Sequence, residues 1–323
     1  MKKKISGDYE YLNAITDHTI RPVWSVMIPV YNCAVFLEDT LNCVLQQAPA
    51  TDKMEIVVVD DCSTDNPEEV VQRLGKGRVK YVRQSKNLGH TGNFETCLAL
   101  SKGIYVHLLH GDDRVLPGFY DEFTSLFKNN SSLMAAFCRH HYIDEDNVVM
   151  GASAEHMPHS GEFKHFFNQI TRNQIIQTPS VVVKRAVYEK IGMFNHRLSW
   201  CEDWEMWSRI GKNYSFGYIN TILAEYRMHT KSNSGKYLLS GENIRDLRRG
   251  IEIINSFVED TFEKKDSKKV ATAYYASYAI KQAVYFLEKG EKQGARNQLK
   301  AAFLMSKNTR LNLQIIKLFL KSI

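Results

Sequence analysis

WSVMIPV at residues 24–30 and EIVVV at residues 55–59 are short, uninterrupted apolar runs, and they decide the fold class. Runs of this kind are typical of strands buried on both faces, as in a parallel sheet covered by helices. Between them, Leu37, Leu41 and Val44 recur at the spacing of one helical face. Further predicted elements are strands at 78–83 and 104–109 and a helix at 93–102. The alternation predicts an α/β fold with a mostly parallel central sheet flanked by helices.

The organisation of the chain changes along its length. After residue 115 the alternation becomes irregular, and beyond residue 240 the strand patterns end. The last third reads as helices at residues 242–260, 268–289 and 292–306. The pattern therefore predicts three parts, namely an N-terminal extension at 1–21, an α/β domain at 22–238 and a basic α-helical region at 239–323.

Charge also separates the chain into two parts. The 323 residues carry a net charge of +6, and 44% of them are hydrophobic, which is typical of a globular protein. Residues 1–230 contain 24 Lys and Arg against 27 Asp and Glu, whereas residues 231–323 contain 18 against 9. The positive excess therefore lies in the last third. No nucleic-acid-binding module accompanies it, so we expect no nucleic acid partner.

The first residues and the cysteines favour a cytoplasmic location. Met1-Lys2-Lys3-Lys4 precedes polar residues rather than the apolar stretch of a secretion signal. No window reaches the ~18 apolar residues of a membrane span. The six cysteines form no C-x-x-C pair, and we expect them to be reduced thiols.

Six polar clusters follow along the chain, most of them after apolar runs, where ligands bind in open α/β sheets. They are Pro29-Val30-Tyr31-Asn32, Asp60-Asp61-Cys62-Ser63-Thr64-Asp65, Asn87-Leu88-Gly89 with Gly92-Asn93, His110-Gly111-Asp112-Asp113, Glu202-Asp203-Trp204 and Tyr226-Arg227-Met228-His229. In this order and spacing, the clusters resemble those of glycosyltransferase family 2, the inverting nucleotide-sugar enzymes of the GT-A fold. The resemblance covers about residues 22–235. It implies transfer of a sugar from a nucleotide sugar, expected to be a UDP-sugar, to a saccharide or lipid-linked acceptor during synthesis of a cell-surface polysaccharide or glycoconjugate.

Asp112 and Asp113 are the predicted metal ligands. Cleavage of a sugar–diphosphate bond expels a negatively charged leaving group, which a divalent ion held by carboxylates stabilises. Mn²⁺ or Mg²⁺ suits such oxygen ligands. The resemblance assigns the metal chiefly to Asp113 and places Asp112 nearer the ribose. The family's commonest form has a further Asp where this chain has His110, so that acid is missing here. The alternative is that the two aspartates only form a turn or a helix cap.

The resemblance assigns the nucleotide sugar to residues of the first three clusters. Asp61 would accept a hydrogen bond from uracil N3–H, Pro29 and Tyr31 would line the base, and Asn87 and Asn93 would approach the ribose and diphosphate. Tyr31 as a buried core aromatic is an open alternative. An alternative for Asp60 and Asp61 is that one or both only cap the helix that carries Pro67. Asp65 is better placed for that capping role.

Asp203 is the predicted catalytic base. An inverting transfer needs one carboxylate that removes the proton of the acceptor hydroxyl. Trp200, Trp204 and Trp207 are close enough in sequence to form an apolar wall that raises the pKa of Asp203 and stacks on a sugar face. The alternative is that Glu202 and Asp203 only favour the dipole of a helix that starts there.

Arg227 and His229 alternate along an extended segment, so their side chains point to the same side. By resemblance, this segment closes over the diphosphate, where such groups offset the charge of the leaving group. A structural pairing of Arg227 with Glu225 or another surface acid is equally open.

Five other histidines lack metal-ligand spacing. For most of them a surface or core role is expected: His107, His110, His140, His141 and His165.

The final stretch, RLNLQIIKLFLK at residues 310–321, is apolar with interspersed basic residues. Such a helix suits the surface of an anionic membrane, which would place the protein at the inner face of the cell membrane. The alternative, which we slightly favour, is a helix that packs its apolar stripe on the catalytic domain or on a second subunit.

Two rival functions stay open at this point. A nucleotidyltransferase uses similar sheets and acidic metal sites, but residues 29–32 lack the Gly-rich phosphate loop that it would need. A non-catalytic subunit that binds nucleotide sugars is the other rival, because His110 replaces the family's usual acid.

Overall fold

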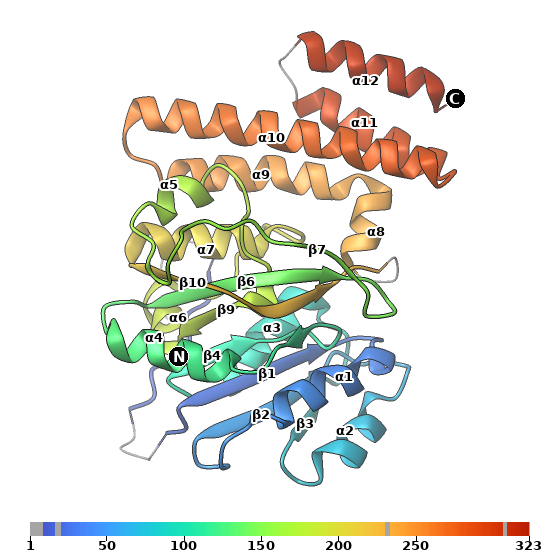
Figure 1. Ribbon diagram of the computed structural model, residues 1–323. Helices are drawn as coiled ribbons and strands as arrows, with labels where there is room; N and C mark the ends of the chain where they lie inside the picture. The colour runs from blue at the N-terminus through green and yellow to red at the C-terminus, as the bar shows by residue number, and fades with distance from the viewer. Residues whose placement is uncertain (1–8, 17–20, 230–232, 306–308, 323) are drawn as a thin grey trace. The chain divides into compact units, whose positions relative to one another are not determined.

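The computed structural model describes residues 9–16, 21–229, 233–305 and 309–322 (Figure 1). The chain forms two compact units. The first holds residues 1–164, 176–196 and 213–228, and the second holds residues 165–175, 197–212 and 229–323. Three segments that the sequence assigns to the α/β domain, 165–175, 197–212 and 229–238, thus group with the C-terminal residues. The predicted boundaries after residues 21 and 238 stay a prediction.

The first unit contains a sheet of ten strands. They are β1 (Trp24–Val30), β2 (Met54–Asp60), β3 (Lys80–Arg83), β4 (Tyr105–Leu108), β5 (Arg114–Val115), β6 (Ala135–Ile143), β7 (Val149–Ala152), β8 (Gly161–Glu162), β9 (Val181–Lys184) and β10 (Phe216–Arg227). The strand order is β3-β2-β1-β4-β9-β6-β10-β5, with β7 paired to β6 and β8 paired to β10.

Parallel pairing runs through one half of the sheet, in the order β3-β2-β1-β4. Every residue of β1 is buried, which fits its unbroken apolar sequence. β9 pairs antiparallel with both β4 and β6, whereas β6 and β10 pair parallel. The sheet is therefore mixed, because β9 runs back between two groups of parallel strands. Val30 and Asp60 are in register at the carboxyl ends of β1 and β2, so the polar clusters after these strands meet at one edge.

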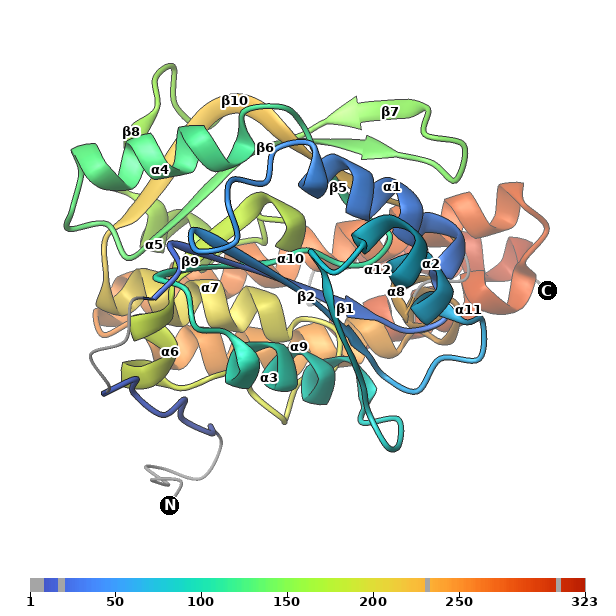
Figure 2. The ribbon, with the colours of Figure 1, turned by 90° about the horizontal axis from the view of Figure 1, so that it is seen from below.

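Helices cover both faces of this sheet (Figure 2). On one face lie α1 (Ala34–Leu45), α2 (Pro67–Gly75) and α4 (Phe119–Asn129), and on the other lie α3 (Gly89–Leu100) and α6 (Arg185–Ile191). On the first face, Leu37 and Leu41 of α1 and Phe123 of α4 share one buried core with Val26 and Ile28 of β1. The predicted α/β fold, with a central sheet flanked by helices, is confirmed.

The loop after β2 caps a different helix from the one that the sequence indicates. α2 begins at Pro67, but its N-cap residue Asn66 has a φ of 62° and makes no side-chain cap hydrogen bond. Oδ2 of Asp65 instead accepts a hydrogen bond from the Ala34 N–H at the start of α1, at 2.7 Å. The prediction that Asp65 caps α2 is therefore wrong, because this loop folds back toward the start of α1.

The second unit consists of helices. They are α5 (Phe166–Ile170), α7 (Glu202–Asn213), α8 (Asn233–Ser240), α9 (Glu242–Ser256), α10 (Thr261–Glu288), α11 (Lys292–Met305) and α12 (Thr309–Lys321). α10 starts earlier than its sequence pattern predicts, because Oδ1 of Asp260 accepts hydrogen bonds from the N–H groups of Phe262 and Glu263 at 2.9 and 2.8 Å. Within the described part of the chain, no helix has both the length and the apolar character needed to span a membrane.

The buried His107 of β4 is expected to make stability depend on pH. Its Nε2 lies 2.9 Å from the Pro179 carbonyl oxygen and its ring stacks on Phe119, and burial lowers the pKa of the imidazole to about 4. The unfolded chain takes up this proton near the ordinary pKa of 6.5, so the contribution of His107 to stability is complete above that pH and is lost as the pH falls toward 4. Between pH 6.5 and 4.5, we expect the free energy of unfolding of the His107→Gln variant to fall less than that of the unaltered protein. Urea unfolding at each pH measures this difference. Equal losses in the two proteins would contradict this assignment.

Candidate active site

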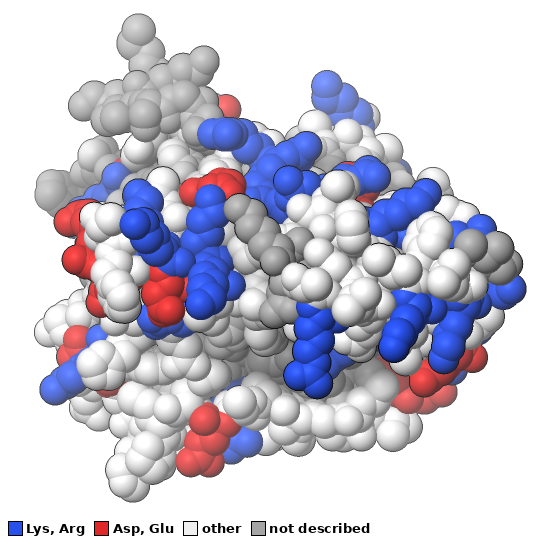
Figure 3. All heavy atoms as spheres, turned by 90° about the horizontal axis from the view of Figure 1, so that it is seen from above, with Lys and Arg blue, Asp and Glu red and all other residues white. Residues whose placement is uncertain are grey.

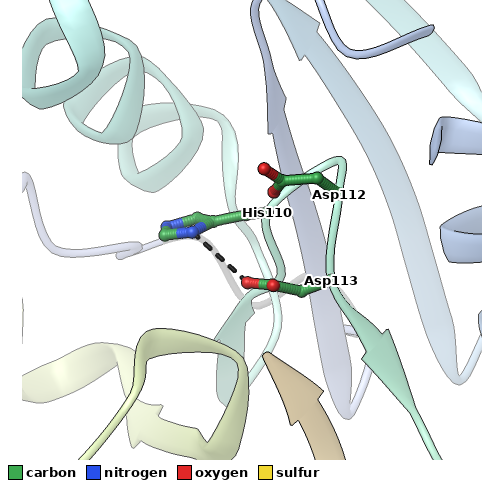
Figure 4. Close-up of side chains that lie close together, drawn as sticks. All are labelled: His110, Asp112 and Asp113. Atoms are coloured by element: carbon green, nitrogen blue, oxygen red, sulfur yellow. Dashed lines mark ion pairs between the residues drawn. The ribbon is translucent and has the colours of Figure 1, made fainter. Parts of the chain in front are cut away.

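The turn after β4 brings three potential metal ligands together (Figure 4). His110, Asp112 and Asp113 each offer one ligand atom, and these atoms lie within 4.8 Å of one another. The three side chains project to the same side of the turn, and His110 Nδ1 lies 3.4 Å from Asp113 Oδ2. We call residues 110–113 the acidic turn. His110 thus joins the cluster instead of taking the surface or core role expected for it, with its ring stacked on Phe94 at a centroid distance of 5.2 Å.

Gly111 lets the acidic turn lie against β1. A Cβ added at Gly111 would come within 2.5 Å of Val30 Cγ1 and 2.9 Å of Cys33 Sγ, so a larger residue would push the turn away. The Gly111 N–H donates a hydrogen bond to the Pro29 carbonyl at 3.1 Å. Pro29, which is predicted to line the nucleotide base, therefore also anchors the acidic turn.

Asp113 is the most deeply buried member of the acidic turn, with 1% of its surface exposed. Its Oδ1 accepts a hydrogen bond from the Arg227 N–H at 2.8 Å, and its backbone carbonyl accepts one from Thr40 Oγ1 at 2.8 Å. Burial is the main cause that raises the pKa of the Asp113 carboxyl to about 6, against the lowering effect of His110 and with a further rise from the charge of Asp112. The fold thus keeps a carboxylate in a place where its charge is poorly solvated.

The residues of the acidic turn fit a divalent metal ion. Asp113 Oδ2 is buried and accepts no well-formed hydrogen bond from the described residues, although His110 Nδ1 lies 3.4 Å away. A carboxylate oxygen in such a place is costly to desolvate unless a cation pairs with it. Asp112 adds a second carboxylate, and oxygen ligands are those that Mg²⁺ and Mn²⁺ prefer.

Arg227, at the end of β10, holds the acidic turn in place. Its Nε donates a hydrogen bond to the Asp112 carbonyl at 2.8 Å, and its Nη1 donates one to the Asp144 carbonyl at 2.9 Å. The guanidinium carbon lies 4.7 Å from the ring centre of Phe36. The Arg227 side chain has no exposed surface, so these contacts position backbone that carries the site.

The ion pairs around Arg227 differ from the first pairing suggested by the sequence. Its Nη2 lies 3.5 Å from Asp39 Oδ2, and Asp39 is partly exposed. Glu225 instead pairs with Arg114, at 2.7 Å. Arg227 therefore pairs with another surface acid and not with Glu225. A contact of Arg227 with the diphosphate stays a prediction.

Asp61 joins the end of β2 to the loop after β3. Its Oδ1 accepts a hydrogen bond from the Leu88 N–H at 2.7 Å, and its carbonyl accepts one from Asn87 Nδ2 at 3.1 Å. Asp61 is 2% exposed, and burial raises the pKa of its carboxyl. Asp60 has other partners, because its Oδ2 accepts a hydrogen bond from the Tyr81 hydroxyl at 2.7 Å. The two adjacent carboxylates therefore serve different parts of the structure.

Asn93 and Tyr31 lie near the ends of β2 and β1. Asn93 Nδ2 donates a hydrogen bond to the Val59 carbonyl at 2.9 Å, and Asn93 Oδ1 is buried without a hydrogen-bond partner among the described residues. Tyr31 is 41% exposed, so the alternative of a buried core aromatic is excluded. The roles of these residues in binding a nucleotide stay predictions.

Asp203 lies in the first turn of α7, in the second unit. Its Oδ2 accepts a hydrogen bond from Gln174 Nε2 at 2.9 Å, and its Oδ1 accepts one from the Trp204 N–H at 2.6 Å. The two hydrogen bonds hold the Asp203 carboxylate in one orientation. The local geometry of Asp203 is therefore compatible with the predicted role.

Two of the tryptophans near Asp203 are core residues. Trp204 and Trp207 are each 1% exposed, and Trp204 Nε1 donates a hydrogen bond to the Ile170 carbonyl at 2.6 Å. Their burial excludes the predicted stacking of these two rings on a sugar. Trp200, which precedes α7, is the half-buried member of the three.

Asp246 of α9 fixes the loop that leads to Asp203. Its Oδ2 accepts hydrogen bonds from the N–H groups of Ser199, Trp200 and Cys201, at 3.0, 2.8 and 3.1 Å. Sequence reasoning missed this residue, because an Asp within a charged helical pattern carries no sign of a partner 45 residues earlier.

The predicted site residues divide between the two units. The first unit holds Pro29, Tyr31, Asp61, Asn87, Asn93, Asp112, Asp113 and Arg227, and the second holds Asp203 and His229.

The sequence model of glycosyl transferase family 2 matches residues 25–192, which is more than half of the chain and includes the acidic turn. The chain belongs to this family. The family 2 enzyme is 25% identical to the Escherichia coli protein WfgD, a UDP-Glc:alpha-D-GlcNAc-diphosphoundecaprenol beta-1,3-glucosyltransferase, over 73% of this chain and 87% of WfgD.

Solved structures of similar fold support the architecture of the family 2 enzyme. TarS 1–349 of S. aureus, in complex with UDP-GlcNAc, aligns with a TM-score of 0.66 and 14% identity over 93% of this chain and 88% of TarS 1–349. The mannosyltransferase PcManGT of Pyrobaculum calidifontis, in complex with GDP-Man and Mn²⁺, aligns with a TM-score of 0.55 and 16% identity over 95% of this chain and 82% of PcManGT. At these identities the likeness concerns the fold.

Removal of the Arg227 guanidinium is expected to destabilise the enzyme strongly. In Arg227→Met, the partly buried carbonyls of Asp112 and Asp144 lose a donor, and an unsatisfied group costs up to about 1–3 kcal/mol where water cannot replace the donor. We therefore expect a loss of about 2–5 kcal/mol in the free energy of unfolding, measured in urea. Arg73→Met is the matched control, because Arg73 is exposed and pairs with the exposed Glu38, so a change within about 0.5 kcal/mol is expected there. Equal stability of the two variants would refute the positioning role.

Proposed function

We propose that this glycosyltransferase moves a sugar from a UDP-sugar, with inversion, to a saccharide or lipid-linked acceptor during synthesis of a cell-surface polysaccharide or glycoconjugate. The acidic turn carries the proposal, because it sets the buried carboxylate of Asp113 beside the carboxylate of Asp112 and the imidazole of His110. The UDP-GlcNAc in the TarS complex and the UDP-Glc donor of WfgD support a UDP-sugar donor. The GlcNAc-diphosphoundecaprenol acceptor of WfgD supports a lipid-linked acceptor.

The nucleotide is proposed to bind at the carboxyl ends of β1 and β2. Asp61 would accept a hydrogen bond from uracil N3–H, and a site built for such a donor rejects bases that lack it. The exposed ring of Tyr31 would lie along the base, whose other contact is the backbone at Pro29. Asn87 and Asn93 would approach the ribose and the diphosphate.

The acidic turn is the proposed metal site. Asp113 and Asp112 would hold Mn²⁺ or Mg²⁺, with His110 within reach of the same ion. When bound, the ion supplies Lewis-acid stabilisation of the diphosphate leaving group. Arg227 keeps the backbone of the turn in position, and His229 is proposed to contribute to the diphosphate side of the site.

Asp203 is the proposed general base. Its carboxylate would take the proton of the acceptor hydroxyl while the hydroxyl oxygen attacks the anomeric carbon from the face opposite the diphosphate. The bond between the anomeric carbon and the diphosphate oxygen breaks, and UDP leaves. The hydrogen bonds from Gln174 and from the Trp204 N–H orient the carboxylate for this step. Asp246 supports the same geometry through the loop before α7.

Metal and donor are expected to stabilise the enzyme together through Asp113. A ligand that binds only the folded state at 100 times its Kd adds about 2.7 kcal/mol, so Mn²⁺ with UDP should raise the Tm by several degrees. Asp113→Asn should abolish the part of this shift that depends on Mn²⁺, because a neutral amide is a poor ligand. Asp121→Asn, which changes an exposed acid of α4, should keep the whole shift. The same Mn²⁺-dependent shift in Asp113→Asn would remove Asp113 from the metal site.

Loss of the base is expected to stop transfer but not donor binding. Asp203→Asn should lower kcat for sugar transfer by about 10²–10⁴-fold, the usual contribution of a general base. Its Kd for UDP-sugar, measured by calorimetry, should change less than about threefold, because the base acts on the acceptor. Glu259→Gln, an exposed acid of the same unit, is the control with unchanged transfer. Full turnover by Asp203→Asn would end the assignment, and binding without turnover in the unaltered enzyme would favour the non-catalytic subunit.

A further inference from the structure

The last two helices carry exposed apolar side chains in an unusually basic setting. Phe303 and Leu304 of α11 and Leu313, Ile316 and Leu320 of α12 are all exposed, Leu304 to 64% and Leu320 to 66%. We call these five residues the C-terminal apolar face. We propose that this face docks on the surface of an anionic phospholipid bilayer.

α12 does not use its apolar residues mainly for packing within the chain. Ile315 is its buried residue, and the other apolar side chains of α12 stay partly or largely exposed. A groove of about 410 Å³ lies between α11 and α12, lined by apolar side chains and by Lys300. The packing that we slightly favour from the sequence therefore leaves most of the apolar stripe uncovered. An open apolar groove beside exposed apolar side chains suits acyl chains.

The part of the chain that carries this face is rich in basic residues. Residues 289–323 contain eight Lys and Arg against one acidic residue, Glu291. Figure 3 shows this side of the molecule, where blue basic side chains stand among uncharged surface. On α12, Arg310, Lys317 and Lys321 recur at i, i+7 and i+11 and are all exposed, so they form one stripe of the helix.

The stripes of α12 have the geometry of a helix that lies in a membrane interface. Leu313, Ile316 and Leu320 recur at i, i+3 and i+7, which places them on one stripe, a quarter turn from the basic stripe. A helix lying in the interface sinks such an apolar stripe toward the acyl chains while neighbouring Lys and Arg meet anionic headgroups.

Charge favours a bilayer over a second copy of the chain. A symmetric dimer through this face would bring the basic stripes of two copies together, and like charges at an interface oppose association. An anionic bilayer offers apolar depth and opposite charge to the same surface. The docking does not depend on the proposed sugar transfer. Its use in reaching a lipid-linked acceptor does rest on that proposal.

The test is cosedimentation of the full chain with vesicles of phosphatidylcholine containing 30% phosphatidylglycerol, with pure phosphatidylcholine vesicles for comparison. We expect at least tenfold tighter binding to the anionic vesicles, and weaker binding in 0.5 M NaCl because salt screens the charges. The triple variant Leu313→Gln, Ile316→Gln and Leu320→Gln should lose at least tenfold in affinity. The double variant Lys317→Gln and Lys321→Gln should lose roughly 30-fold for anionic vesicles.

Val148→Gln combined with Met150→Gln is the matched control. Both residues are as exposed as the C-terminal apolar face but follow the acidic residues Asp144 and Asp146, so unchanged vesicle binding is expected. All substituted side chains are exposed, and unchanged Tm and UDP-sugar hydrolysis confirm that each variant is folded. Absence of binding to anionic vesicles, or equal binding by the triple variant, overturns the proposal. A dimer in light scattering that the triple variant dissociates assigns the face to a second copy and overturns it too.

Discussion

The carboxylate of Asp113 is buried at a point where three elements meet, and the shape of the acidic turn depends on how that charge is held. The Arg227 N–H of β10 bonds to Oδ1, and Thr40 of α1 bonds to the carbonyl of the same residue. Strand, helix and turn are therefore tied to one acidic residue, through its side chain and its backbone carbonyl. Burial raises the pKa of Asp113, which shows that the ionised group is costly to keep there. The same cost makes a cation near Oδ2 favourable, so the burial of this carboxylate suits a metal ion.

Charge and chemistry are distributed differently in the two parts of the chain. The first 230 residues are slightly acidic, and the acidic turn and Asp61 lie among them at the ends of parallel strands. The net charge of +6 arises wholly from the last third, where Lys and Arg outnumber Asp and Glu two to one. The positive charge is therefore not a sign of nucleic acid binding. In the proposed docking surface, it accompanies the exposed apolar side chains of α11 and α12.

The sequence predicted those features that depend on local pattern. Unbroken apolar runs indicate buried parallel strands, so the placement of Asp61, Asp112 and Asp113 just after strands was predictable, whereas their roles in binding stay predictions. Features that depend on contacts between residues distant in sequence were not predicted. The ring of His110 stacks on Phe94 from another helix, and Asp65 caps a helix that begins 31 residues earlier. Burial of Trp204 likewise depends on tertiary packing, which no spacing rule contains.

Inversion at the anomeric carbon is the central claim of this account. The most direct measurement is proton NMR of the sugar first released when the enzyme hydrolyses an α-linked UDP-sugar with Mn²⁺, recorded before mutarotation. Attack opposite the diphosphate predicts the β anomer at early times, together with UDP. Early release of the α anomer would contradict a single displacement assisted by a base.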